Sequence, residues 1–166
     1  SICFDEGMAR LLGEIFETID EFGHLELRSG NGRGLESEFV EGSFWEGNLH
    51  SRLMINLPLD NKTLYENAAV LVTDFAIDDP QQLVPLITAA IRARKTSLML
   101  ICNTLSEACT GFLMAESTRK ILPVFAVKTP EMRLEAQIGA MEDIAVLTRA
   151  KTLTLHAGET LQGVTP

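Results

Sequence analysis

The chain has 166 residues, a net charge of −9 and an apolar fraction of 46%, with 12 glycines and 6 prolines. This composition predicts a folded globular protein of one domain, or of one domain and part of another, and excludes a disordered chain. The negative charge disfavours nucleic-acid binding, because a phosphate backbone repels an acidic surface.

Apolar runs and cysteines indicate the compartment. No run approaches the roughly 20 apolar residues that cross a membrane, and the N-terminus lacks the basic start of a signal peptide. Cys3, Cys102 and Cys109 form no CxxC pair and have no spacing typical of zinc binding. We therefore expect a cytoplasmic protein with reduced thiols, with Cys102 and Cys109 in the core and no membrane partner.

The first forty residues predict a helix followed by a hairpin. Residues 6–22 have apolar side chains at helical spacing, and Gly23 is typical of a helix end. Residues 24–28 and 35–40 alternate between apolar and polar, as half-buried strands do. The glycine-rich segment 29–34 between them predicts a hairpin turn.

The next segment has no regular pattern. Gly42 precedes an aromatic pair and is typical of a bulge or of a hinge, and local sequence favours the bulge. Residues 49–59 are apolar without a helical or strand period, so Leu49, Leu53 and Met54 have no evident place in a core. An irregular apolar loop either covers a core or forms a contact surface.

Strand and helix patterns alternate through the remainder of the chain, which predicts an α/β fold with right-handed crossovers. The expected strands are 69–73, 97–102, 122–127 and 151–155, and the expected helices are 80–93, 106–118 and 132–148. Acids and a proline at 78–80 are typical of a helix start. The helix at 106–118 begins with Thr104 or Ser106 as its N-cap.

Two of these helices have more apolar surface than one buried face requires. In the helix at 80–93, Val84 and Ile87 belong to a line beside the expected core positions. The helix at 106–118 carries two neighbouring stripes: Ala108, Phe112 and Ala115, and Cys109, Leu113 and Met114. Two stripes indicate either full burial or a face that contacts a partner. Adjacent parallel helices with apolar outer faces would form a groove for polypeptides, in which Met114 could repack against varied partners.

Catalytic and metal-binding patterns are weak. The glycine-rich turn is not followed by a helix, and no phosphate-loop motif occurs. His24, His50 and His156 lack metal-type spacing, which favours solvated or packing roles.

One acidic cluster leaves an alternative open. Asp74, Asp78 and Asp79 lie at an expected strand end, where α/β enzymes often place acids. Helix capping is the simpler role for them. A small α/β ligand-binding or enzymatic domain with its site at these three residues is therefore the alternative function.

An ordered set of short motifs resembles the bacterial-type (group I, GroEL-like) chaperonins over roughly residues 9–160. The matching segments are Val40-Glu41-Gly42, Ile55-Asn56, LVPLI at 83–87, AVKTP at 126–130 and MEDIAVLT at 141–148. The family shows V-E-G, I-N, M-L-P-V-L, A-V-K-A-P and M-L-Q-D-I-A-x-L-T at the same spacing.

The resemblance implies an apical-domain-like layered β/β/α fold with two paired surface helices. Residues 1–41 would be a segment of the intermediate domain, and residues 42–166 an apical substrate-binding domain that is incomplete at its C-terminus, with Gly42 as the hinge. Carried over position by position, the implied polypeptide-binding residues are Leu49, Leu53, Met54, Val84, Ile87, Cys109, Leu113 and Met114. Cys109, Leu113 and Met114 would then face outward, across from Val84 and Ile87.

The resemblance also implies partners and chemistry. Non-native polypeptides are the expected partners, with a co-chaperonin lid as a further one and a homo-oligomeric ring for the full-length parent. The ATP-binding domain of the family lies outside this chain. We therefore expect no enzymatic activity, metal or cofactor here, and expect ATP and magnesium to be needed by the full-length parent.

Overall fold

A computed structural model describes residues 5–21, 23–27, 34–45, 47–59, 62–130, 134–158 and 160–161. Contacts divide the chain into two compact units, Ser1–Trp45 and Glu46–Pro166. The expected assignment of residues 1–41 to an intermediate domain and of residues 42–166 to an apical domain remains a prediction, as does the hinge at Gly42.

The first unit contains helix α1 (Glu6–Ile19), close to the predicted range. The Asp5 side chain caps it by accepting hydrogen bonds from the backbone N–H groups of Gly7 (2.9 Å) and Met8 (3.1 Å). The helix ends at Asp20, with a φ of 57°, before the predicted stop at Gly23. No residue of α1 is buried, although the helix is amphipathic.

The predicted hairpin after α1 is wrong within the part of the first unit that is described. Residues 23–27 and 34–41 form no strand, and the predicted turn at 29–34 lies outside the described residues except for Gly34. Phe39 and Val40 are exposed. Because a lone two-stranded hairpin is marginally stable in water, alternation alone does not fold it without a surface to pack on.

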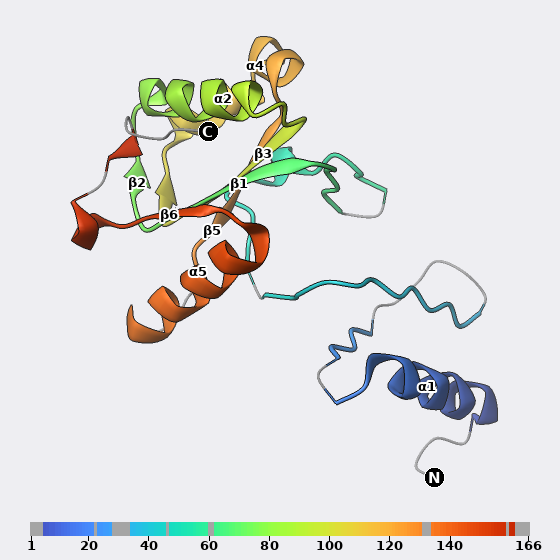
Figure 1. The fold of residues 1–166 in the computed structure, drawn as a ribbon. Helices are drawn as coiled ribbons and strands as arrows, with labels where there is room; N and C mark the ends of the chain where they lie inside the picture. Colours follow the sequence, from blue (N-terminus) through green and yellow to red (C-terminus); the bar gives the residue numbers. More distant parts are fainter. Residues whose placement is uncertain are drawn as a thin grey trace. The chain divides into compact units, whose positions relative to one another are not determined.

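The second unit is built on a four-stranded parallel sheet (Figure 1). Its strands are β1 (Ala68–Thr73), β3 (Ser97–Cys102), β5 (Val124–Lys128) and β6 (Lys151–Leu153), in the order β5-β3-β1-β6. All three neighbouring pairs are parallel. The predicted α/β fold is therefore confirmed.

Helices cover both faces of this sheet, as a parallel sheet requires. The helices are α2 (Leu83–Arg92), α3 (Glu107–Met114), α4 (Glu116–Ile121) and α5 (Leu134–Thr148), with 3-10 turns η1 (Arg52–Met54), η2 (Pro80–Gln82) and η3 (Leu155–Ala157). Figure 1 shows α2 and α5 on opposite sides of the strands. Among the described residues, no helix is long and apolar enough to cross a membrane.

The helix predicted at 106–118 is divided in two. Ala115 adopts an extended backbone, with φ −58° and ψ 136°, so that α3 ends at Met114 and α4 begins at Glu116. The apolar stripe expected at Ala108, Phe112 and Ala115 assumed one continuous helix. Because the helix breaks at Ala115, this residue does not share a helix face with Ala108 and Phe112.

A second, two-stranded parallel sheet aligns the starts of α2 and α3. Strand β2 (Ala76–Ile77) pairs with β4 (Thr104–Leu105), and each lies shortly before its helix. The Ser106 N–H donates to the Ile77 carbonyl (3.0 Å), and the Ser106 hydroxyl donates to the Asp78 carbonyl (3.0 Å). The same hydroxyl accepts from the N–H of Cys109 (3.2 Å), so Ser106 and not Thr104 is the N-cap of α3.

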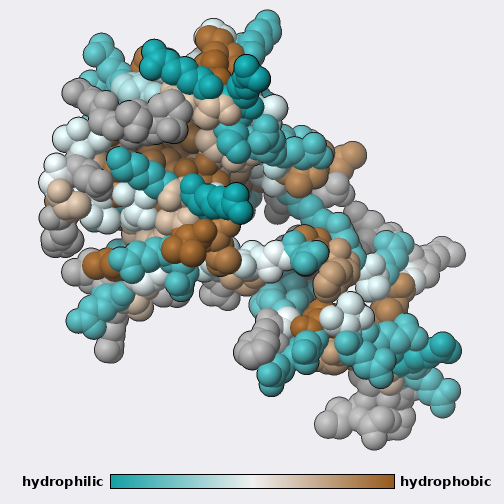
Figure 2. Space-filling model, viewed as in Figure 1, coloured by the Kyte–Doolittle hydropathy of each residue, from teal (hydrophilic) through white to brown (hydrophobic). Residues whose placement is uncertain are grey.

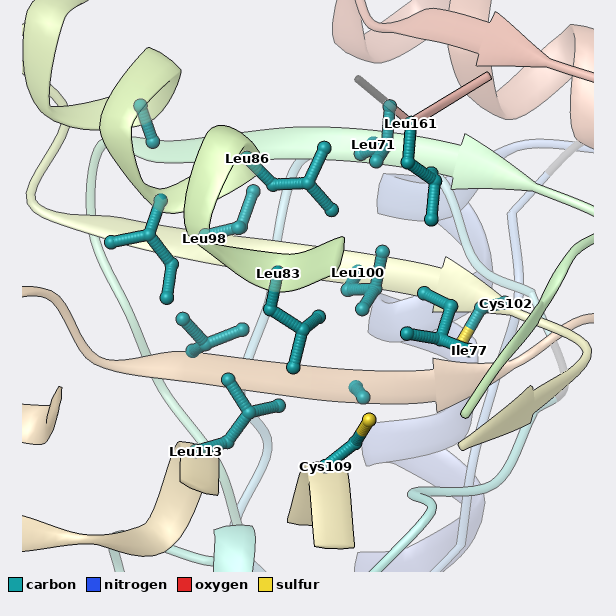
Figure 3. Close-up of a cluster of buried hydrophobic side chains, with 14 of the residues drawn as sticks. Leu71, Ile77, Leu83, Leu86, Leu98, Leu100, Cys102, Cys109, Leu113 and Leu161 are labelled. Atoms are coloured by element: carbon teal, nitrogen blue, oxygen red, sulfur yellow. The ribbon is translucent and has the colours of Figure 1, made fainter. Parts of the chain in front are cut away.

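One core lies between the sheet and the helices α2 and α3. Figure 3 shows Leu83 and Leu86 of α2 above Leu98 and Leu100 of β3, with Leu113 of α3 beside them. Leu83, Leu100 and Leu113 are completely buried. This packing holds both helices in place over the sheet.

Replacing Ser106 with alanine should lower the free energy of unfolding by about 1–2 kcal/mol, because it removes the cap of α3 and the bond to Asp78 together. Urea unfolding followed by circular dichroism measures the change. Ser117→Ala is the matched control, since Ser117 is exposed on α4. Equal stabilities of the two variants would contradict the role of Ser106.

Candidate functional site

Helix α2 presents one predicted contact residue to solvent and buries another. Val84 is 50% exposed, and Ile91 lies exposed two turns further along the same helix. Ile87 is only 8% exposed and belongs to the core. The expectation that Ile87 faces outward is therefore wrong, because the sheet beneath α2 takes Ile87 together with Leu83 and Leu86.

Helix α3 has the opposite orientation to the one predicted. Cys109 and Leu113 are completely buried and point toward the sheet (Figure 3), whereas Ala108 is exposed and Phe112 is half-buried. Leucine and cysteine side chains fill the space over the sheet that alanines would leave empty. Burying the Leu113 side chain contributes about 1.5–3 kcal/mol to this packing, and the half-buried Phe112 retains part of its own burial. Met114 is half-buried at the end of the helix.

The loop at 49–54 covers the outer edge of the sheet. Leu49 forms an antiparallel bridge with Val127 of β5, and the His50 N–H donates to the Ala126 carbonyl (2.9 Å). Met54 is buried, and its Sδ accepts from the Ala126 N–H (3.1 Å). The loop therefore closes the edge of β5, and the placement of Met54 outside the core is wrong. Leu53 remains 70% exposed, and Leu49 is half-buried.

The eight predicted polypeptide-binding residues are thus divided by the fold. The exposed or half-buried ones are Leu49, Leu53, Val84 and Met114, and the buried ones are Met54, Ile87, Cys109 and Leu113. Of the predicted groove, α2 exposes Val84 but buries Ile87, and α3 buries both Cys109 and Leu113. A binding role for any of them remains a prediction.

A hollow of about 460 Å³ lies beside Met114, at the junction of α3 and α4. Its other lining residues are Asn56, Tyr65, Glu116, Arg119, Lys120 and Pro123. The Asn56 side chain donates to the Leu64 carbonyl (2.7 Å) and accepts from the Leu64 N–H (3.0 Å), which closes the loop that forms one wall. Sequence reasoning missed Tyr65, because only the fold brings this loop to α3.

The Tyr65 ring is held by a neighbouring aromatic side chain. It stacks on the ring of Phe125, with centroids 4.9 Å apart. The hollow therefore combines an apolar wall of Tyr65, Met114 and Pro123 with the charged side chains of α4. It offers both apolar contacts and charged groups.

A second hollow, of about 420 Å³, lies at the carboxyl ends of β3 and β5. Its lining residues are His50, Asn103, Thr104, Leu105, Lys128, Thr129 and Gln137. The His50 Nε2 lies 3.0 Å from the Cys102 carbonyl oxygen and 3.4 Å from the Cys102 Sγ. These two residues are 52 positions apart, so their pairing could not be predicted from sequence spacing.

The ionisation of this pair argues against thiol catalysis. Burial, with the nearby Cys109 adding to it, raises the pKa of Cys102 to about 12, so its thiol stays protonated at neutral pH. Burial also lowers the pKa of His50, and the positive charge of Lys128 lowers it further, although the bond to the Cys102 carbonyl opposes the shift. A protonated, buried thiol beside a neutral imidazole is a packing pair and not an activated nucleophile.

The acidic cluster behind the alternative function serves the backbone. Asp79 caps η2 by accepting from the Gln81 N–H (2.8 Å), and Gln82 completes a capping box. Asp74 accepts from the Leu155 N–H (3.0 Å), which fastens η3 to the end of β1. Within the described ranges, no group of acids, histidines and cysteines could hold a metal ion. These contacts support the capping interpretation.

No protein-family model matches the chain. Among solved structures, the chain is similar to the chaperonin gp146 from the bacteriophage EL 2 (Pseudomonas aeruginosa), with a TM-score of 0.47 and 19% sequence identity. The match covers 96% of this chain and 30% of that chaperonin, so this chain spans less than a third of the other's length.

Leu113→Ala should lower the free energy of unfolding by about 2–5 kcal/mol, because it opens a cavity in the core. Val84→Ala, on the exposed face of α2, should change it by less than about 1 kcal/mol. Urea denaturation measures both. Similar losses in the two variants would overturn the assigned orientation of α3.

Cys102 in the folded chain should react with iodoacetamide at pH 8 more slowly than an exposed cysteine, by on the order of a thousandfold. The expected difference follows from its pKa of about 12 and its burial. Asn103→Cys supplies the exposed reference one residue away. Peptide mass spectrometry compares the two sites, and a Cys102 that reacts as fast as the reference would refute the assignment.

Proposed function

We propose that this chain is the polypeptide-binding portion of a chaperonin-like protein, and that it assists folding by holding non-native chains through exposed apolar side chains. The observation that carries the proposal is the exposure of Leu53 and Val84 in a well-packed α/β domain. Both occupy positions that the resemblance in the sequence marks for contact with polypeptides.

The energetics of these contacts fit weak binding. Each exposed leucine or valine that a client covers contributes about 1.5–3 kcal/mol before the cost of ordering the client. Two or three such contacts give a weak affinity for one domain. A ring of identical domains would raise the avidity without new contacts, so weak single sites suit an oligomeric parent.

The surface that supports binding is more scattered than a continuous groove. Leu53 is exposed on the loop that pairs with the edge of β5, and Val84 and Ile91 are exposed on α2. Met114 lines the hollow beside α4. On the face drawn in Figure 2, apolar side chains alternate with hydrophilic ones. Scattered apolar contacts can accept varied sequences, because no single client geometry is required.

The buried members of the predicted set then support the surface from below. Cys109 and Leu113 hold α3 against the sheet, and Ile87 does the same for α2. Their substitution would act through the fold and not through contact with a client. A test of binding must therefore use the exposed positions.

The remaining expectations concern the longer protein. ATP hydrolysis with magnesium, assembly into a homo-oligomeric ring, and a co-chaperonin lid are proposals for the parent, of which this chain would be a part. A cytoplasmic location is likewise a proposal. Function as a small-molecule enzyme at Asp74, Asp78 and Asp79 is not favoured, because the Asp74 and Asp79 carboxylates are already used by the backbone.

The chain should suppress the light scattering of a chemically unfolded client diluted into buffer, and the double variant Leu53→Glu, Val84→Glu should lose at least half of that suppression. Charges at these positions would oppose burial by an apolar client segment. The measurement is scattering at a fixed ratio of chain to client.

The matched control is the double variant Val146→Glu, Leu147→Glu, which adds the same two charges at exposed apolar positions of α5. It should retain the suppression of the unsubstituted chain. Circular dichroism shows that both variants are folded. Equal suppression by the two double variants, or none by the unsubstituted chain, would contradict the proposal.

A further inference from the structure

The hollow at the carboxyl ends of β3 and β5 brings together polar groups from four separate segments. Cys102 of β3 and Lys128 of β5 are partners in the parallel register, so their side chains emerge on the same face of the sheet. The pairing of residues 48–50 with β5 places His50 beside them.

The chemistry of the lining is cationic and rich in hydrogen-bond donors. Lys128 supplies a positive charge, Asn103 an amide and Thr104 a hydroxyl, and none of the lining residues is acidic. Within the portion of the chain that the structure describes, Lys128 has no carboxylate within ion-pair distance. The lining of this hollow therefore differs in charge from the chain as a whole, whose net charge is −9.

One wall of the hollow is held in place by side-chain hydrogen bonds. The Gln137 amide, in the first turn of α5, donates to the Thr129 hydroxyl (3.2 Å) and to the Pro130 carbonyl (3.0 Å). The Thr129 oxygen accepts that bond, so its own hydrogen remains available to a ligand. The Thr129 N–H donates to the Cys102 carbonyl (3.1 Å), which ties this wall to β3.

The bond of His50 defines how its ring can act. A carbonyl oxygen only accepts, so the Nε2 that lies 3.0 Å from the Cys102 carbonyl carries a hydrogen. In the neutral ring the other nitrogen, Nδ1, is then an acceptor. Protonation converts Nδ1 into a donor that can bind an anion, while the Nε2 hydrogen stays bonded to the Cys102 carbonyl.

We propose that this hollow binds a small oxyanion, a carboxylate or phosphate group, through Lys128, Asn103, Thr104 and the protonated ring of His50. Charge-assisted hydrogen bonds to such a group are about twice as strong as bonds between neutral partners. The site is separate from the exposed apolar residues Leu53 and Val84, so this inference does not rest on the proposed chaperone function.

Binding is linked to the protonation of His50. Burial and the charge of Lys128 keep its pKa below the usual value, and a bound anion would offset both effects. The described groups that act on the ring are Lys128 from β5 and the neutral Cys102 from β3. The affinity for acetate, which stays largely ionised over this range, should therefore rise as the pH falls from 7.5 toward 5.5, because the anion favours the protonated ring.

Titration of the 166-residue chain with inorganic phosphate, and separately with acetate, tests the site. Chloride at equal ionic strength is the reference. Two-dimensional NMR of the imidazole signals should show His50 shifting with saturation and its pKa rising, while His24 of the first unit stays unchanged. The anion that binds more tightly identifies a phosphate or a carboxylate as the natural ligand group.

Lys128→Gln should weaken binding about tenfold, since it removes one charge-assisted hydrogen bond. Lys151→Gln is the matched control, because Lys151 is the exposed first residue of β6. His50→Gln should remove the pH dependence between 5.5 and 7.5 while leaving the fold intact by circular dichroism. Equal affinities of the two lysine variants, or a His50 signal that responds to chloride as it does to phosphate and acetate, would overturn the proposal.

Discussion

Coverage of the parallel sheet on the side of α2 and α3 is the constraint on which the second unit depends. The sheet face that carries Leu98 and Leu100 is apolar, and the inner surfaces of α2 and α3 supply much of its cover. Cys109, Leu113 and Ile87 are therefore committed to the core. What the two helices offer to a partner is the remainder: Val84, Ile91 and a half-buried Met114. An apolar side chain on α2 or α3 can either pack in the core or contact a partner, and in this chain Cys109, Leu113 and Ile87 pack in the core.

The architecture was predictable because most of its elements carry strong local signals. Apolar runs bounded by turn residues locate β1, β3, β5 and β6, and the Asp79-Pro80 pair marks the helix start in the structure. The orientation of α3 was not predictable in this way. Its two stripes differ by one residue position, and the helix break at Ala115 carries no glycine or proline. Only the sheet, through the volume that it leaves, selects Cys109 and Leu113.

Prediction of the sites was limited for a related reason. Exposure of Val84 and Leu53 agrees with the positions that the family resemblance marks, whereas the hollows at Met114 and His50 depend on contacts between distant segments. The first unit shows the converse limit. Leu35 and Phe39 follow a strand pattern, yet they remain exposed and form no strand. The alternating pattern shows which side chains would be buried in a strand, but the described residues of this unit include no surface that buries Leu35 and Phe39.

The edge of β5 has a consequence for how the domain could handle unfolded chains. Residues 48–50 already pair with its backbone, and the N–H of Ala126 donates to Met54. The opposite edge, at β6, is only three residues long. Among the described residues, this sheet therefore offers an extended polypeptide no long open edge that it could join as a further strand. A domain that met aggregation-prone chains through its backbone would itself act as a template for their assembly. Contact through side chains instead selects clients by the apolar surface that they expose, which is the property that separates an unfolded chain from a finished one.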